Sequence, residues 1–91
     1  NMAITGIAPN PFNPRTTIHF DVARAGKIRL SVYDLRGRLV KDLVAQEMRP
    51  GRHQVIWNGR DRDGRAAATG IYFVRMTGDG TALTAKMVLA K

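Results

Sequence analysis

The side chains that could do chemistry in this 91-residue chain are few and scattered. The single serine is Ser31, and the two histidines are His19 and His53. No G-x-S-x-G elbow activates the serine. The histidines follow neither the HxH nor the HExxH spacing of metal ligands, and the chain has no cysteine. We therefore expect no catalytic residues and no enzyme activity.

The densest group of oxygen ligands lies in segment 58–65, which reads Asn-Gly-Arg-Asp-Arg-Asp-Gly-Arg. Asn58, Asp61 and Asp63 could offer oxygens to calcium, and Gly64 permits a sharp turn. The segment lacks the ligand spacing and distant glutamate of an EF-hand, and its arginines place positive charge beside any cation. We expect a turn-rich loop whose Asn and Asp side chains cap backbone amides, with calcium as the weaker alternative and no other cofactor.

Short runs of alternating apolar residues, each ended by a turn signal, position these groups. The runs are 17–22, 27–33, 53–57, 71–76 and 83–89. Segment 39–45 also fits a helical stripe, but its place after a turn at 34–38 favours a strand. A short edge strand at 6–8 would end at Pro9 and Pro11. This series predicts an all-β fold, an antiparallel immunoglobulin- or fibronectin III-like β-sandwich of about seven strands.

The alternation also predicts which side chains face the core. Ser31 and His19 fall on outward faces, Phe12 and Tyr33 are candidates for exposed aromatics, and Gly37 supplies the positive φ of its turn. Segment 10–14 is expected to pin the chain entry through proline geometry and Asx turns. The inward-facing residues are expected to be Ile18, Phe20, Val22, Ile28, Leu30, Val32, Val55, Trp57, Tyr72, Val74, Met76, Leu83, Ala85, Met87 and Leu89.

Composition limits the classes of partner. The net charge is +8, from eleven arginines and four lysines spread along the chain. Attraction to polyanions is therefore expected, but the aromatics needed to stack nucleic-acid bases lie in strand patterns that serve the core, so no specific nucleic acid is expected. Only Tyr33 and Phe73 are candidates for carbohydrate stacking.

The length and the termini indicate how the chain is organised. No apolar run is long enough for a membrane helix, and the start lacks the features of a signal peptide. The methionine at position two suggests that residues 1–91, read as one domain without an internal repeat, are cut from a longer chain.

The order of short motifs along residues 9–91 resembles that of a known family. It runs Asn-Pro-Phe-Asn-Pro, Thr-Thr-Ile-x-Phe, Val-Tyr-Asp-Leu-x-Gly-Arg, Pro-Gly-x-His-x-Val-x-Trp-Asn-Gly-x-Asp, Thr-Gly-Ile-Tyr-Phe-Val-Arg-Met and Lys-Met-Val-Leu. This order resembles the immunoglobulin-like domain named after the flagellar hook-capping protein FlgD. It is also similar to type A C-terminal sorting domains of the type IX secretion system. Asn58 stands where the family has an aspartate.

The resemblance implies a non-catalytic C-terminal module of a larger secreted protein, which serves sorting or cell-surface attachment. Its partners would be the export machinery or a cell-surface component and the upstream domain, with a secreted or cell-surface location and no membrane insertion. Contact would involve an edge strand or the C-terminal strand through β-addition. The alternatives are a hook-capping-type assembly domain or an accessory module that binds carbohydrate or polyanion. The predicted contact residues are Lys86, Met87, Val88, Leu89, Ala90 and Lys91.

Overall fold

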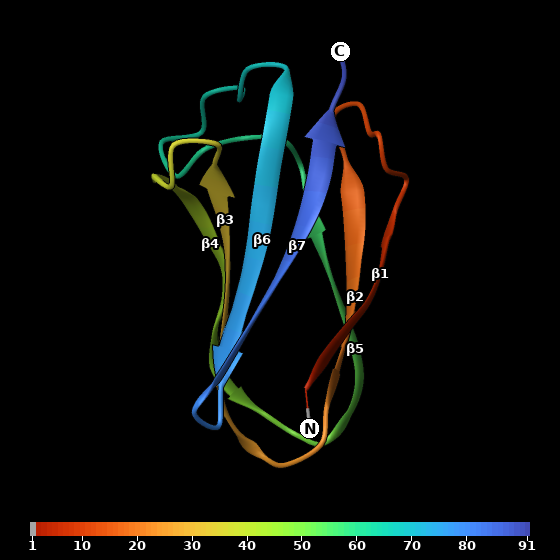
Figure 1. Cartoon of the computed structure of the whole chain (residues 1–91), viewed down its shortest axis with the longest axis vertical. Helices are drawn as coiled ribbons and strands as arrows, with labels where there is room; N and C mark the ends of the chain where they lie inside the picture. Colours follow the sequence, from red (N-terminus) through yellow and green to blue (C-terminus); the bar gives the residue numbers. More distant parts are fainter. Residues whose placement is uncertain (1) are drawn as a thin grey trace.

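Seven strands pair into two antiparallel sheets in the computed structural model, which describes residues 2–91 (Figure 1). The three-stranded sheet has the order β1-β2-β5, and the four-stranded sheet has the order β4-β3-β6-β7. The strands are β1 (Ala3–Ala8), β2 (Thr16–Val22), β3 (Gly26–Asp34), β4 (Leu39–Met48), β5 (Gly51–Trp57), β6 (Gly70–Gly78) and β7 (Thr81–Leu89). This arrangement confirms the predicted immunoglobulin-like sandwich.

The inner faces of the two sheets form the core, as the alternation predicted. Every residue expected to face inward is buried or half-buried. Trp57 is fully buried and lies between two other aromatic rings, with centroids 5.5 Å from Phe12 and 5.2 Å from Tyr72. Aromatic pairs at such separations add to the stabilisation from burial. This cluster closes the core beneath the loops that follow β1 and β5.

Strand β4 explains why segment 39–45 looked partly helical. Ser31 pairs with Asp42 while its predecessor pairs with Val44, so Leu43 is an extra residue in β4. A second register shift leaves Val40 extra in the same way. Such β-bulges interrupt the period of two. Val40, Leu43 and Val44 therefore all pack against the core at a spacing that mimics a helix.

Two predictions of exposure were wrong. Phe12 is 2% exposed and belongs to the core. Ser31 does point to the outer face of β3, yet it is only 2% exposed. Its hydroxyl donates a hydrogen bond to the carboxylate of Asp42, its cross-strand partner on β4, and that carboxylate also accepts one from Nε of Arg29, two residues earlier on β3, at 3.0 Å.

The segment between β1 and β2 is pinned as predicted, but by long-range contacts. Asn10 Oδ1 accepts a hydrogen bond from the Val88 amide at 3.0 Å, and Asn10 Nδ2 donates to the Lys86 carbonyl at 3.3 Å. The Phe12 amide donates to the Val88 carbonyl, and the Ala90 amide donates to the Phe12 carbonyl. The segment thus runs along the end of β7 like a short extra strand. Strand β1 itself is longer than the expected 6–8 and pairs only with β2.

The loops of the sandwich collect at its two ends. The turns at 34–38 and 58–69, the segment at 9–15 and the C-terminus share the end at the top of Figure 1, and the N-terminus lies at the opposite end. Residues 2–91 include no helix with the length and apolar character needed to cross a membrane.

Candidate interaction surface

The six residues predicted as partner contacts divide between the core and the surface. Met87 and Leu89 are fully buried, because they alternate inward along β7. Lys86, Ala90 and Lys91 are exposed and Val88 is half-buried. Within the folded domain, therefore, the side chains of the second group are the accessible ones of the six.

The free edge of β7 is already occupied over its last residues. Lys86, Val88 and Ala90 direct their backbone groups away from β6, and these groups bond to Asn10 and Phe12. An added strand would have to displace this pairing. The end of β7 accordingly presents side chains on a sheet face and not an open backbone edge.

Two matching turns shape the loop end. Each has the pattern Asp-x-x-Gly-Arg, at 34–38 and at 61–65. In both, the Asp Oδ1 accepts the amides two and four residues later, all at 2.9 Å. In both, the glycine has φ of 82° and its amide donates to the Asp carbonyl. The chain thus forms the same hydrogen-bonded turn twice. The repeated pattern is present in the sequence, but it was not identified there.

The electrostatics of these turns follow from their hydrogen bonds. The backbone amide of Arg38 lowers the pKa of Asp34 below its ordinary value of 3.8. The amide of Arg65 does the same for the pKa of Asp61. Both carboxyls are therefore ionised at neutral pH and hold no proton to give as general acids. Their hydrogen bonds stabilise the two turns.

The candidate calcium ligands lie in the second of these turns and, for Asn58, three residues before it. Asn58 Oδ1 accepts the Arg60 amide at 3.1 Å, and Asp61 Oδ1 accepts two amides. Asp63 Oδ2 pairs with the Arg65 guanidinium at 2.8 Å. Asn58 and Asp61 thus cap backbone amides, as the sequence predicted, whereas Asp63 pairs with a side chain. Among residues 2–91, no group of three or more His, Cys, Asp or Glu side chains is placed to hold a metal ion.

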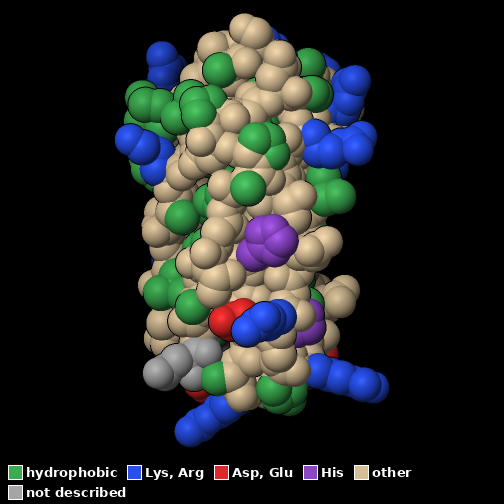
Figure 2. Space-filling model, turned by 90° about the vertical axis from the view of Figure 1, so that its right-hand side faces the viewer, with side chains coloured by type: hydrophobic (Ala, Val, Ile, Leu, Met, Phe, Trp, Pro, Cys, Tyr) green, Lys and Arg blue, Asp and Glu red, His purple; other side chains and the backbone are tan. Residues whose placement is uncertain are grey.

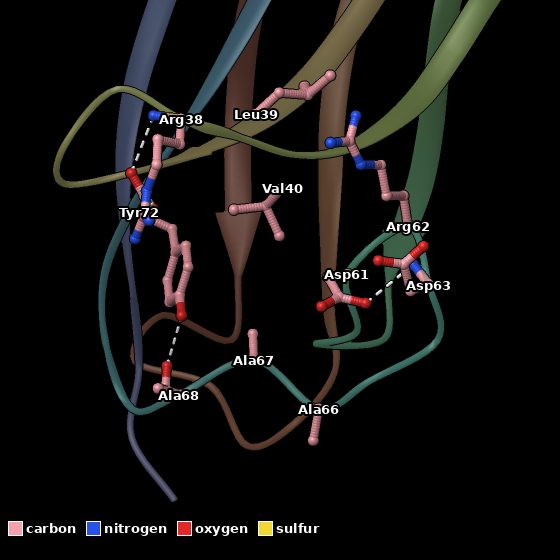
Figure 3. A pocket seen from close by; sticks show the side chains of 11 residues that line it. Arg38, Leu39, Val40, Asp61, Arg62, Asp63, Ala66, Ala67, Ala68 and Tyr72 are labelled. Carbon is pink, nitrogen blue, oxygen red and sulfur yellow. Dashed lines mark hydrogen bonds and ion pairs between the residues drawn. The ribbon is translucent and has the colours of Figure 1, made fainter.

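A groove of about 630 Å³ separates the two turns (Figure 3). Val40 lies in the middle of this view, with Tyr72 on one side and Asp61 on the other. The Tyr72 hydroxyl donates to the Ala68 carbonyl at 2.6 Å, and the Arg62 amide donates to the Val40 carbonyl at 3.0 Å. These bonds fix both walls to the strands.

The end that holds the groove is also rich in cations. Its acidic residues are Asp34, Asp61 and Asp63, which the turns engage. Figure 2 shows the three-stranded face, where basic side chains lie mainly toward the two ends and a histidine lies in the middle. The basic residues in the loops and tail of the groove end are Arg15, Arg36, Arg38, Arg60, Arg62, Arg65 and Lys91.

An exposed apolar patch lies on the outer face of the four-stranded sheet, and of its members the sequence pointed only to Tyr33 and Phe73 as outward aromatics. We call it the outer-face patch, and it comprises Tyr33, Leu35, Ile71, Phe73 and Val88. Leu35 is 66% exposed and Ile71 37%, while the other three are half-buried. The signal was present in the run Ile-Tyr-Phe-Val at 71–74, which is apolar on both faces of β6.

The serine and the histidines do not form a catalytic set. Ser31 lies on the outer face of β3 in one sheet, and His19 lies on β2 in the other. His53 stacks on Phe20 with centroids 5.5 Å apart, and its Nε2 lies 2.7 Å from the Arg49 carbonyl. The core therefore separates Ser31 from any histidine base.

Strand pairing of this kind defines the class: an immunoglobulin-like β-sandwich domain. Within that class, the chain belongs to the FlgD Ig-like domain family, whose model matches residues 13–82. The basal-body rod modification proteins FlgD of Salmonella typhimurium and Salmonella typhi are each 34% identical to it over 64 residues. That alignment covers 68% of this chain, which spans only 28% of the relatives' length.

Solved structures share the fold at low identity. PorU of Porphyromonas gingivalis, solved as a latent dimer, has a TM-score of 0.76 at 18% identity, over 97% of this chain and 9% of its own. PorZ of the same organism, a surface component of its type IX secretion system, gives 0.68 at 24%, over 94% and 11%. FlgD from P. aeruginosa gives 0.66 at 17%, over 97% and 70%.

Proposed function

We propose that this chain is a non-catalytic recognition module of a larger exported protein, used for sorting by a type IX secretion system or for attachment at the cell surface. The observation that carries this is the fold shared with PorU and PorZ over almost the whole chain, in each case as a small part of a much longer protein. The separated serine and histidines support a role without catalysis. The partners would be export machinery or a surface component, together with the module's own upstream domain.

Export of a reporter tests the proposal. A reporter enzyme is fused ahead of residues 1–91 and expressed in a host with a type IX system. Removal of 86–91 is a poor control, because it deletes the fully buried Met87 and Leu89 and would unfold the domain. Charge reversal of the exposed tail, Lys86→Glu with Lys91→Glu, leaves the core intact.

The matched control reverses charge at the other end of the sandwich, with Arg24→Glu and Lys27→Glu. We expect the parent fusion and the control pair to release the reporter outside the cell. We expect the tail pair to retain it. Retention of the parent fusion in the periplasm, with the domain folded, would reject sorting. Equal export of all three would reject the tail as the contact.

A hook-capping-type assembly domain is the second candidate, favoured by the 34% identity to the two Salmonella FlgD proteins. The test is to replace the Ig-like domain of Salmonella FlgD with residues 1–91 and to score motility. Motile cells would favour assembly, whereas non-motile cells that contain the folded chimera would count against it.

A further inference from the structure

We infer that the outer-face patch is a docking site for an acidic protein segment that carries an apolar anchor. The inference rests on the proposed recognition function and names the surface and the partner chemistry. The patch is continuous by strand register, because Tyr33 pairs with Phe73 and Ile71 pairs with Val88. Contiguous exposed apolar surface of this kind marks interaction sites.

A hollow of about 340 Å³ lies within the patch. Tyr33, Leu35, Phe73, Arg75 and Thr84 are among the residues that line it. Arg75 pairs with Thr84 across the strands, two residues along from the Phe73–Lys86 pair and on the same face. The lining therefore combines two aromatic rings with a guanidinium group, a composition typical of protein interface centres.

The charges around the patch select an acidic partner. Neither Arg75 nor Lys86 has an ion-pair partner within residues 2–91. The carboxylate beside the hollow belongs to Asp34, and it is engaged by two backbone amides and the Arg38 guanidinium. Carboxylates on the incoming segment would meet two available cations, which complements the net charge of +8.

The aliphatic members of the patch favour protein over glycan or nucleic acid. Leu35, Ile71 and Val88 offer no ring for a sugar or base to stack on. They pack well against apolar side chains, and the hollow is roomy enough for a leucine or phenylalanine anchor. Because Asn10 and Phe12 occupy the nearby edge of β7, the segment would lie on the sheet face.

The test is an amide-resolved NMR titration of the 91-residue chain with three synthetic peptides. The probe repeats Glu-Leu-Glu-Phe, one control repeats Glu-Ala-Glu-Ala, and the other repeats Lys-Leu-Lys-Phe. We expect the probe to shift signals of β6 and β7 around Phe73 and Lys86. The Glu-Ala peptide should bind about tenfold more weakly, because it lacks the anchor.

A variant pair localises the contact. Leu35→Ser with Arg75→Glu should weaken binding about tenfold or more. The matched control, Ile56→Ser with Arg52→Glu, changes an exposed apolar and an exposed basic side chain on the three-stranded sheet and should bind within about twofold of the parent.

Equal weakening by both pairs, binding of either control peptide as tight as that of the probe, or shifts confined to the loop end would overturn the inference. So would tighter binding at the patch by oligogalacturonate or single-stranded DNA, which would assign it to another ligand class. The reporter assay is read separately. Export without peptide binding rejects the patch alone, and peptide binding without export rejects the sorting function alone.

Discussion

Replacement of Trp57 by alanine should destabilise the domain by about 4 kcal/mol. A tryptophan side chain buries roughly 150–250 Å², and at about 25 cal/mol per Å² this gives roughly 4–6 kcal/mol before the part that alanine retains is subtracted. Trp-to-Ala changes in cores typically cost about 3–5 kcal/mol, in agreement with that figure. Trp57 is fully buried against Phe12 and Tyr72, so the site has two rings that lose a partner.

The loss would remove a large share of the stability of a domain of this size, which is about 5–14 kcal/mol. Guanidinium chloride unfolding followed by far-UV circular dichroism measures it. The midpoint should fall by roughly 1–2 M at unchanged slope. Trp57→Phe keeps most of the burial but loses the Nε1 hydrogen bond to the Arg60 carbonyl, 2.9 Å long, and should cost about 1–2 kcal/mol.

Ile56 is the matched control, because it neighbours Trp57 but points outward and is 50% exposed. Ile56→Ala should change the free energy of unfolding by no more than about 0.5 kcal/mol. If Trp57→Ala cost under about 1.5 kcal/mol, or no more than the Ile56 control, the aromatic cluster would not be a main source of the domain's stability, which would refute this prediction.

Three further outcomes follow from backbone geometry and titration. Gly59→Ala should cost roughly 2–4 kcal/mol, because φ is 76° and a Cβ would lie 2.6 Å from a backbone carbonyl oxygen; Gly37→Ala, with φ of 82° and open space, should cost about 1 kcal/mol in the same denaturation assay. Burial raises the pKa of Tyr72 above 10.0, so its neutral form stabilises the fold below that pH and the contribution is lost as pH rises; the melting temperature above pH 10 should fall more steeply in the parent than in Tyr72→Phe. The pKa values of Asp34 and Asp61 are lowered, so the stability that their ionised forms contribute is complete above about pH 4 and is lost as the pH falls. The variant Asp34→Asn with Asp61→Asn should therefore show a melting temperature that falls less between pH 6 and pH 2 than that of the parent. An equally steep fall would contradict the role given to these carboxylates in the turns.

Most strands could be predicted from the sequence because their side chains alternate between the core and the solvent. The period of two held wherever pairing is regular, as for Ile18 and Phe20 in β2. It failed in β4, where bulges at Val40 and Leu43 add residues that no local pattern specifies. A bulge is set by the neighbouring strand, so it becomes visible only once β3 and β4 are paired.

The surface was less readable for a related reason. Phe12 lies among prolines and asparagines in what reads as a loop, and it is buried where its own backbone and Asn10 bond to β7, more than seventy residues away. The outer-face patch likewise joins three segments that are distant in sequence. Long-range pairing of this kind leaves no local signature, whereas the Asp-x-x-Gly-Arg turns are local and could have been found.

The contact between segment 9–15 and β7 limits how a partner can use the C-terminal strand. Val88 and its neighbours bond to Asn10 and Phe12, and Phe12 packs on Trp57 at 5.5 Å. Release of β7 as a free strand would therefore expose Met87 and Leu89 and open the aromatic cluster as well. Since several core side chains would lose their burial together, the cost would approach the whole stability of the domain. A partner that contacts the outward side chains of β7 and its neighbours avoids this cost, so the recognition that we propose would act on the folded face.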